Sequence, residues 1–145
     1  MNSNKIFFTA FLILFSLSII SAKNQLTPEQ KEKAEINYLA GLNSDNEGLR
    51  VSSAYFLGEI KSSKAVIPLM KMLRNDKSES ARTVAALSLI KLGDARGIHL
   101  VKKAIEFNDF EKVRCRCAKF YSGYLCEKNP QKAEEAAQRI VSVFD

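Results

Sequence analysis

The sequence predicts an all-α fold, a short right-handed α-solenoid of about three helix pairs preceded by a capping helix. Two observations predict it. The chain aligns with itself at a constant offset of 32 residues, and the apolar residues inside each aligned segment recur with helical spacing. A pair of helices cannot bury its apolar face alone, so neighbouring pairs must stack on one another. The 145 residues leave room for one such domain.

The first 22 residues have the layout of a secretory signal peptide. Lys5 supplies the positive charge, residues 6–20 are almost entirely apolar, and small residues precede a cleavage point after Ala22. The apolar run is shorter than the roughly 20 residues of a membrane-spanning helix, which favours cleavage over the alternative of a retained anchor. We therefore expect residues 23–145 to be secreted or periplasmic, without stable membrane insertion.

The net charge of the chain is mildly positive. The formal charge of +6 becomes +5 when the signal peptide is removed, because that segment carries Lys5 and no acid. This charge is compatible with an acidic partner, although the basic residues are scattered among acidic ones, as on solvated helix faces. A nucleic-acid partner is disfavoured, because an export signal would carry the protein away from the genome.

A capping helix is predicted over residues 28–44. Thr27 has the position of an N-cap, Pro28 that of the first helical residue, and Gln30 that of the third residue of a capping box. The helix resembles the second helix of a repeat that lacks its first. Its apolar stripe consists of Ile36, Leu39 and Leu42.

Three repeats follow, which we place at residues 46–76, 77–109 and 110–145. Each opens with a helix whose aligned columns need no gaps. The columns are Arg50, Arg82 and Arg114; Ala54, Ala86 and Ala118; and Leu57, Leu89 and Tyr121. Within one repeat these residues share a single helix face, so each repeat begins with an amphipathic helix.

A second helix closes each repeat. Its buried stripe is Val66, Leu69 and Leu73 in the first repeat and Ile98, Val101 and Ile105 in the second. Gly93 is positioned to end a first helix, and the expected N-caps of the second helices are Ser63, Asp94 and Asn129. The last helix is expected to start at Pro130 and to face inward with Ala133, Ala136, Ala137 and Ile140. It either closes the stack or leaves an end that can associate.

The repeats resemble a known family. Arg50-x-x-x-Ala54-x-x-Leu57-Gly58-Glu59-Ile60 is similar to the short HEAT-like repeat of phycobilin lyases, an armadillo-like helical architecture. The second repeat keeps the pattern. The third keeps Arg114 and Ala118 but has Cys and Tyr at other positions of the pattern. Tetratricopeptide and ankyrin repeats have similar periods, but the chain has neither a Trp nor a Thr-Pro-Leu-His motif. The resemblance covers roughly residues 46–126 and implies a protein-binding scaffold.

The arginine column is interpreted as structural. Asp45, Asp76 and Asp109 lie shortly before the three arginines, so ion pairs that bridge the turns between repeats are expected along the stack. Positions that repeat in a solenoid usually serve the contact between repeats. The alternative is a series of anion-binding contacts.

No catalytic group, metal site or cofactor is predicted, and we expect a protein that is not an enzyme. His99 is the only histidine, and Leu100 follows it, so the His-Glu pairs with which HEAT-like di-iron hydroxylases bind metal are missing. The chain also lacks a Gly-rich phosphate loop, a Gly-x-Ser-x-Gly elbow and zinc-type cysteine spacing.

Three cysteines fall in the third repeat. Cys117 aligns with Ala85 and is expected to be buried, whereas Cys126 lies at a helix end and is the candidate for exposure. A disulfide would form only if the helix ended before Cys126, because Cys115 and Cys117 point in different directions on one helix.

The second helices are expected to line a concave, partner-facing surface. The residues that we assign to it are Met70, Lys71, Arg74, His99, Lys102 and Lys103. The predicted function is an exported scaffold that binds another protein. The alternatives are solvated lysines without a partner, an accessory or lyase-like protein that holds a small ligand or chromophore, and a structural module that self-associates.

Overall fold

The computed structural model describes residues 27–144. The predicted signal peptide, residues 1–22, lies outside the described residues. The chain divides into two compact units, residues 1–32 and residues 33–145, and the three repeats lie in the second unit.

The described residues form seven α-helices, a short 3-10 helix and no strand, which confirms the all-α fold. The helices are α2 (Pro28–Gly41), α3 (Glu47–Glu59), α4 (Val66–Asn75), α5 (Glu79–Leu92), α6 (Ala95–Phe107), α7 (Glu111–Lys128) and α8 (Pro130–Phe144), with the 3-10 helix η1 at Ser63–Ala65. Within this part of the chain no helix is both long and apolar enough to span a membrane.

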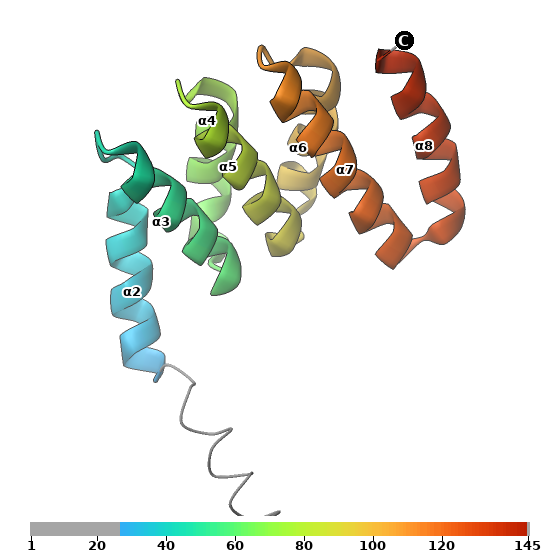
Figure 1. Cartoon of the computed structure of the whole chain (residues 1–145). Helices are drawn as coiled ribbons and strands as arrows, with labels where there is room; N and C mark the ends of the chain where they lie inside the picture. Colours follow the sequence, from blue (N-terminus) through green and yellow to red (C-terminus); the bar gives the residue numbers. More distant parts are fainter. Residues whose placement is uncertain (1–26, 145) are drawn as a thin grey trace, which may run out of the picture. The chain divides into compact units, whose positions relative to one another are not determined.

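The helices of the repeats form two layers (Figure 1). In one layer α3 packs against α5 and α5 against α7, and in the other α4 packs against α6. The layers are joined because α4 and α6 pack against α5, and α6 packs against α7. The last helix, α8, packs against α7, and its contact with α6 is much slighter than that of α4 with α6.

Most helices begin where the sequence predicts, with a side-chain cap. Thr27 and Gln30 form the expected capping box: the Gln30 amide N–H donates to Thr27 Oγ1 (3.2 Å) and the Thr27 N–H to Gln30 Oε1 (2.9 Å). Asp94 caps α6 by accepting from the N–H of Arg96 (2.9 Å). Asn129 precedes Pro130 and accepts from the N–H of Lys132 (3.2 Å).

Ser63 is not the N-cap of the second helix in the first repeat, and this prediction was wrong. Ser63 is the first residue of η1, and α4 begins only at Val66. Ser62, which precedes Ser63, is buried. Its hydroxyl donates to the Glu35 carboxylate (2.5 Å) instead of capping a helix. The 3-10 turn therefore takes the place of a side-chain cap.

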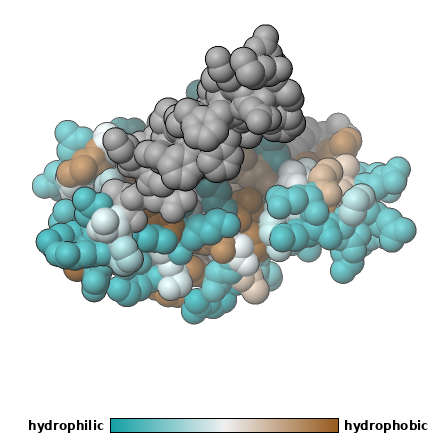
Figure 2. Space-filling model, turned by 90° about the horizontal axis from the view of Figure 1, so that it is seen from below, coloured by the Kyte–Doolittle hydropathy of each residue, from teal (hydrophilic) through white to brown (hydrophobic). Residues whose placement is uncertain are grey.

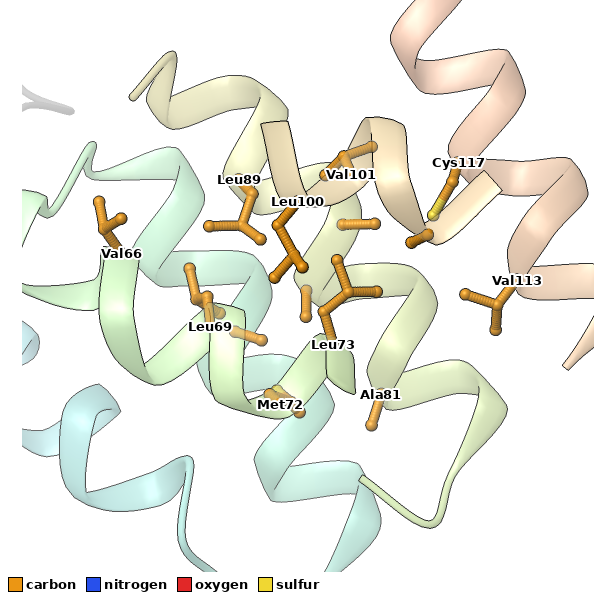
Figure 3. Close-up of a cluster of buried hydrophobic side chains, with 14 of the residues drawn as sticks. Val66, Leu69, Met72, Leu73, Ala81, Leu89, Leu100, Val101, Val113 and Cys117 are labelled. Atoms are coloured by element: carbon orange, nitrogen blue, oxygen red, sulfur yellow. The ribbon is translucent and has the colours of Figure 1, made fainter. Parts of the chain in front are cut away.

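A continuous apolar core runs through the repeats (Figure 3). Its fully buried large side chains include Leu57, Leu69, Leu73, Leu89, Val101 and Val113. Two residues that we expected to face inward are exposed. Ile36 of α2 is 57% exposed, and Ala137 of α8 is exposed, although Leu73 and Ile105 at the equivalent positions of α4 and α6 are buried.

The first helices of the repeats do not all end in the same way. Gly93 ends α5 in the left-handed conformation with φ of 72°, as predicted, and Lys61, 32 residues earlier, has φ of 54°. The equivalent residue of the third repeat, Leu125, is helical, and α7 continues to Lys128. The third helix pair therefore turns at Asn129, later than the other two.

Candidate functional site

The turns between repeats are held by the predicted arginines. Arg50 binds the Asp76 carboxylate through two hydrogen bonds, from Nε (2.8 Å) and Nη2 (2.9 Å). Its Nη1 donates to the carbonyl oxygens of Ser44 and Asp45, both at 3.0 Å. Arg50 thus joins the turn before its own helix, α3, to the turn after the following helix, α4. Its acid partner is the following Asp76, whereas we expected the preceding acid, Asp45.

Arg82 makes the equivalent contacts in the next repeat, between the turn at Asp76 and the turn at Asn108 and Asp109. Its Nε donates to the carbonyl oxygen of Asp76 (2.6 Å), and its Nη1 lies 3.1 Å from the Asp109 carboxylate and 3.4 Å from Asn108 Oδ1. The guanidinium also lies over the Phe110 ring, 4.8 Å from its centroid. Arg82 is buried, so these partners compensate its charge.

Arg114 has the contact to its own turn but, among the described residues, no ion pair. Its Nη1 donates to the carbonyl oxygen of Asn108 (2.9 Å). The equivalent acceptors of Arg50 and Arg82 are also carbonyls six residues earlier. The position that would supply its outer partner, 26 residues later, is Ile140 inside α8 rather than a turn. These three arginines therefore lie in the contacts between repeats.

The arginine contacts shift the pKa of Asp76. The hydrogen bonds from Arg50 lower the pKa of this carboxyl, burial opposes the shift, and the N–H of Ser78 adds to the lowering (2.9 Å). Asp76 is consequently a charged, well-paired group within the stack.

The residues assigned to the partner-facing surface lie on α4 and α6. Lys71, Arg74, His99, Lys102 and Lys103 are exposed, and Met70 is half-buried. His99 and Lys102 line one groove together with Tyr121 and Tyr124 of α7. Lys71 lines a different groove, beside Leu42 and Ile67. The six residues therefore form a broad surface and not one pocket.

The charges of this surface differ from those of α3 and α5. Every basic side chain of α3 and α5, namely Arg50, Arg82 and Lys91, forms an ion pair. Within the described part of the chain, Lys71, Arg74, Lys102 and Lys103 form neither an ion pair nor a hydrogen bond. Helices α4 and α6 contain one acid, Glu106. We call Lys71, Arg74, His99, Lys102 and Lys103 the basic face.

A cleft lies between α6, α7 and α8. It has a volume of about 260 Å³. Ile105, Tyr121, Leu125, Ala136 and Ile140 provide its apolar lining, and Lys102, Glu106, Lys132, Glu135 and Arg139 its charged rim. Sequence reasoning missed this cleft. The alanines of the last helix were no signal of it, because the one that lines the cleft, Ala136, has Ala104 at the equivalent position of α6.

The three cysteines are free thiols on the single helix α7. Cys117 is buried, which raises the pKa of its thiol to about 12, and Cys115 and Cys126 are exposed. No bridge forms because α7 continues past Cys126, the arrangement that we expected to prevent one. Across residues 27–144 no group of three or more His, Cys, Asp and Glu side chains is placed to hold a metal ion.

Hydrophilic side chains dominate the surface that is visible in Figure 2, and apolar side chains appear between them in smaller patches. Several large apolar side chains are exposed, among them Ile67 on α4 (57%) and Phe107 at the end of α6 (76%). Scattered residues of this kind are common on protein surfaces. Exposed apolar area therefore does not by itself mark a site here.

Comparison with known proteins finds a similarity to an enzyme. No protein-family model matches the chain. The chain is similar to the deoxyhypusine hydroxylase of Candida albicans, with 32% identity over 109 residues. The aligned part covers 74% of this chain and 34% of that protein, so the chain spans about a third of the relative's length.

This relationship supports a HEAT-type helical repeat and corrects one expectation. Similarity to a HEAT-repeat enzyme agrees with the all-helical structure, while the finer resemblance to phycobilin-lyase repeats has no matching family model. The expectation that this chain is not an enzyme is contradicted, because the named relative that it matches is an enzyme, a hydroxylase. The similarity is spread over 109 residues at 32% identity, so no local catalytic motif signals it.

Proposed function

We propose that this chain is a HEAT-repeat scaffold that binds another protein through the basic face, and that the bound surface of the partner is acidic. The observation that carries this proposal is the contrast in pairing. The cations of α3 and α5 are compensated within the chain, and the lysines of α4 and α6 are not. An uncompensated group of like charges on adjacent helices favours a partner of opposite charge.

The physical basis is long-range attraction and short-range pairing. Exposed cations accelerate the encounter with an acidic surface, and the effect weakens as salt screens the charges. Lys71, Lys102 and Lys103 have flexible side chains, so each adapts to a carboxylate on the partner. Apolar contacts nearby, such as Met70 and Ile67, would add affinity without depending on salt.

The proposal is tested by affinity capture from the native envelope fraction, followed by measurement of the affinity of the captured protein. Wild type is compared with a Lys71→Glu, Lys103→Glu double variant. The matched control is Arg116→Glu, Lys119→Glu on α7, which changes the net charge equally and also replaces exposed cations. We expect the first variant to lose at least about tenfold in affinity and the control to bind like wild type. Equal losses would show that only net charge matters and would contradict the assignment of the face.

We also propose that the protein is exported and that its mature form begins at Lys23. The layout of residues 1–22 supports this proposal. Expression in the native host, followed by mass spectrometry of the protein from culture medium and envelope fractions, tests it. Recovery of the protein from the cytoplasm with residues 1–22 intact would refute export.

A second candidate function is an accessory role in which the cleft between α6 and α8 holds a small ligand. The similarity to an enzyme and the presence of a cleft with mixed apolar and charged lining favour it. A thermal-shift screen with small carboxylates, amines and bilin-type chromophores tests it. Stabilisation by one compound that is lost in Ala136→Leu would support the candidate, and no stabilisation would argue against it.

A further inference from the structure

Beside the cleft between α6, α7 and α8, the third repeat differs from the first two. Helix α7 continues through Leu125, where the first two repeats turn at Lys61 and Gly93 with positive φ. The inner positions of α8 then carry alanines. Ala133, Ala136 and Ala137 stand in register with Leu69, Met72 and Leu73 of α4 and with Val101, Ala104 and Ile105 of α6.

Apolar surface between α6 and α8 is incompletely covered. Helix α8 makes less contact with α6 than α4 does, and of the three alanines only Ala136 lines the cleft. Ile105 is buried at the cleft, and Tyr121, Leu125 and Ile140 are half-buried around it. The cleft is smaller than the roughly 300–1,000 Å³ of typical small-molecule sites, so its size suits one or two apolar side chains.

The rim of the cleft is charged and unpaired. Among the described residues, Lys102, Lys132 and Arg139 form no ion pair, and neither do Glu106 and Glu135. The cations exceed the acids, and Lys102 belongs both to this rim and to the basic face. The cleft and the basic face therefore join at Lys102 into one surface with an excess of positive charge.

We infer that the cleft binds apolar side chains of an acidic amphipathic helix of the partner protein, and that Lys102, Lys132 and Arg139 pair with its flanking acids. This inference rests on the proposed function and specifies its partner. A groove bordered by two helices accepts a third helix by taking side chains spaced three or four residues apart. Cations exceed acids over the rim and the adjoining basic face, which favours acidic over basic flanks on that helix.

The test uses a defined probe, a stapled helical peptide with leucines at positions i, i+4 and i+7 and glutamates on the flanking faces. Two control peptides carry lysine in place of glutamate, or the same residues in scrambled order. Binding is measured by fluorescence anisotropy. Methyl chemical shifts of Ile105, Leu125 and Ile140 locate the peptide on the full-length mature protein. We expect the acidic peptide to bind at least about tenfold more tightly than either control and to shift these methyl signals.

Two variants separate the cleft from general surface attraction. Ala136→Leu fills the cleft, and its matched control is Ala137→Leu, one residue away on the same helix and exposed. We expect Ala136→Leu and Lys102→Glu each to reduce peptide affinity about tenfold and Ala137→Leu to leave it unchanged. Circular dichroism checks that each variant is folded, and Lys102→Glu, at an exposed position, remains informative if Ala136→Leu is unstable.

The outcomes distinguish this inference from the proposed function. Loss of the captured partner in the Lys71, Lys103 variant but not in Ala136→Leu would overturn the inference and leave the proposed function intact. Loss in neither variant would overturn both. Equal binding of the lysine peptide, or methyl shifts elsewhere than at the cleft, would also overturn the inference. So would sedimentation evidence that a second copy of the chain occupies the cleft.

Discussion

At the residue scale, one position in each turn organises the contacts between repeats. The side-chain oxygen of Ser44, Asp76 or Asn108 accepts the N–H two residues later, and the carbonyl of the same residue accepts an arginine. The sequence predicted the arginines as structural residues, because they repeat. It could not predict that Arg50 pairs with the later Asp76, since that choice depends on distances between turns 26 residues apart.

The pairing of Asp76 predicts an acid-sensitive contribution to stability. Because the pKa of Asp76 is below its ordinary value of 3.8 in the folded state, its contribution is complete above that value and is lost as pH falls through the lowered pKa. We expect Asp76→Ala to lower the free energy of unfolding at pH 7 by roughly 1–3 kcal/mol, because Arg50 and the Ser78 N–H lose their acceptor.

Asp76→Asn is the matched variant, because Asn108 occupies the equivalent place in the next turn. It keeps an acceptor and removes the titrating group. We expect urea unfolding between pH 2.5 and 7 to give two results. At pH 7, Asp76→Asn should lose less free energy of unfolding than Asp76→Ala does. Below pH 4, the free energy of unfolding of Asp76→Asn should depend less on pH than that of wild type. An Asn variant with the acid dependence of wild type would exclude Asp76 as its source.

Burial of the Cys117 thiol predicts the opposite dependence, at alkaline pH. Its folded-state pKa of about 12 lies above the ordinary value of 9.0, so its contribution is complete below pH 9 and is lost as pH rises towards 12. We therefore expect the free energy of unfolding to fall more between pH 8 and pH 10 in wild type than in Cys117→Ala. Equal losses would mean that the thiol ionises as readily in the folded state.

At the element scale, the ends of the first helices predict a pair of opposite stability changes. Gly93 has φ of 72° and open space around it, so Gly93→Ala should cost about 1 kcal/mol through backbone strain alone. Lys61 has φ of 54° at the equivalent position, so Lys61→Gly should stabilise by a few tenths to about 1 kcal/mol. Thermal unfolding of both variants measures this, and a stabilising Gly93→Ala would refute the assigned turn.

Gly58 tests the packing of α3 on α5, and Gly123 of α7 is its matched control. A Cβ on Gly58 would lie 2.8 Å from Cβ of Ser88 and 3.0 Å from its Cα, so Gly58→Ala should destabilise the fold by roughly 1–3 kcal/mol. Gly123 of α7 has nothing within 4 Å, so Gly123→Ala should stabilise by up to about 1 kcal/mol through helix propensity. Chemical denaturation measures both changes in the free energy of unfolding. Equal changes in Gly58→Ala and Gly123→Ala would contradict the close approach of α3 and α5.

At the scale of the whole molecule, the repeat period was sufficient to predict the helices, their order and most of the core. Regular columns such as Leu57 and Leu89 are buried because every repeat makes the same contact with its neighbour. The exposed Ala137 and the cleft beside it could not be predicted, because they arise where the final repeat stops following that rule. The basic face was predicted as a set of residues, but its lack of internal ion pairs became visible only in three dimensions.

The central claim is that the basic face on α4 and α6 binds an acidic partner protein. The measurement that tests it most directly is the dissociation constant of the purified captured partner as a function of NaCl concentration, by isothermal titration calorimetry. It is made with wild type, the Lys71→Glu, Lys103→Glu variant and the Arg116→Glu, Lys119→Glu control. We predict steep weakening with salt for wild type and the control, and weak, nearly salt-independent binding for the first variant. Salt-independent binding of wild type, or equal affinities for all three proteins, would contradict the claim.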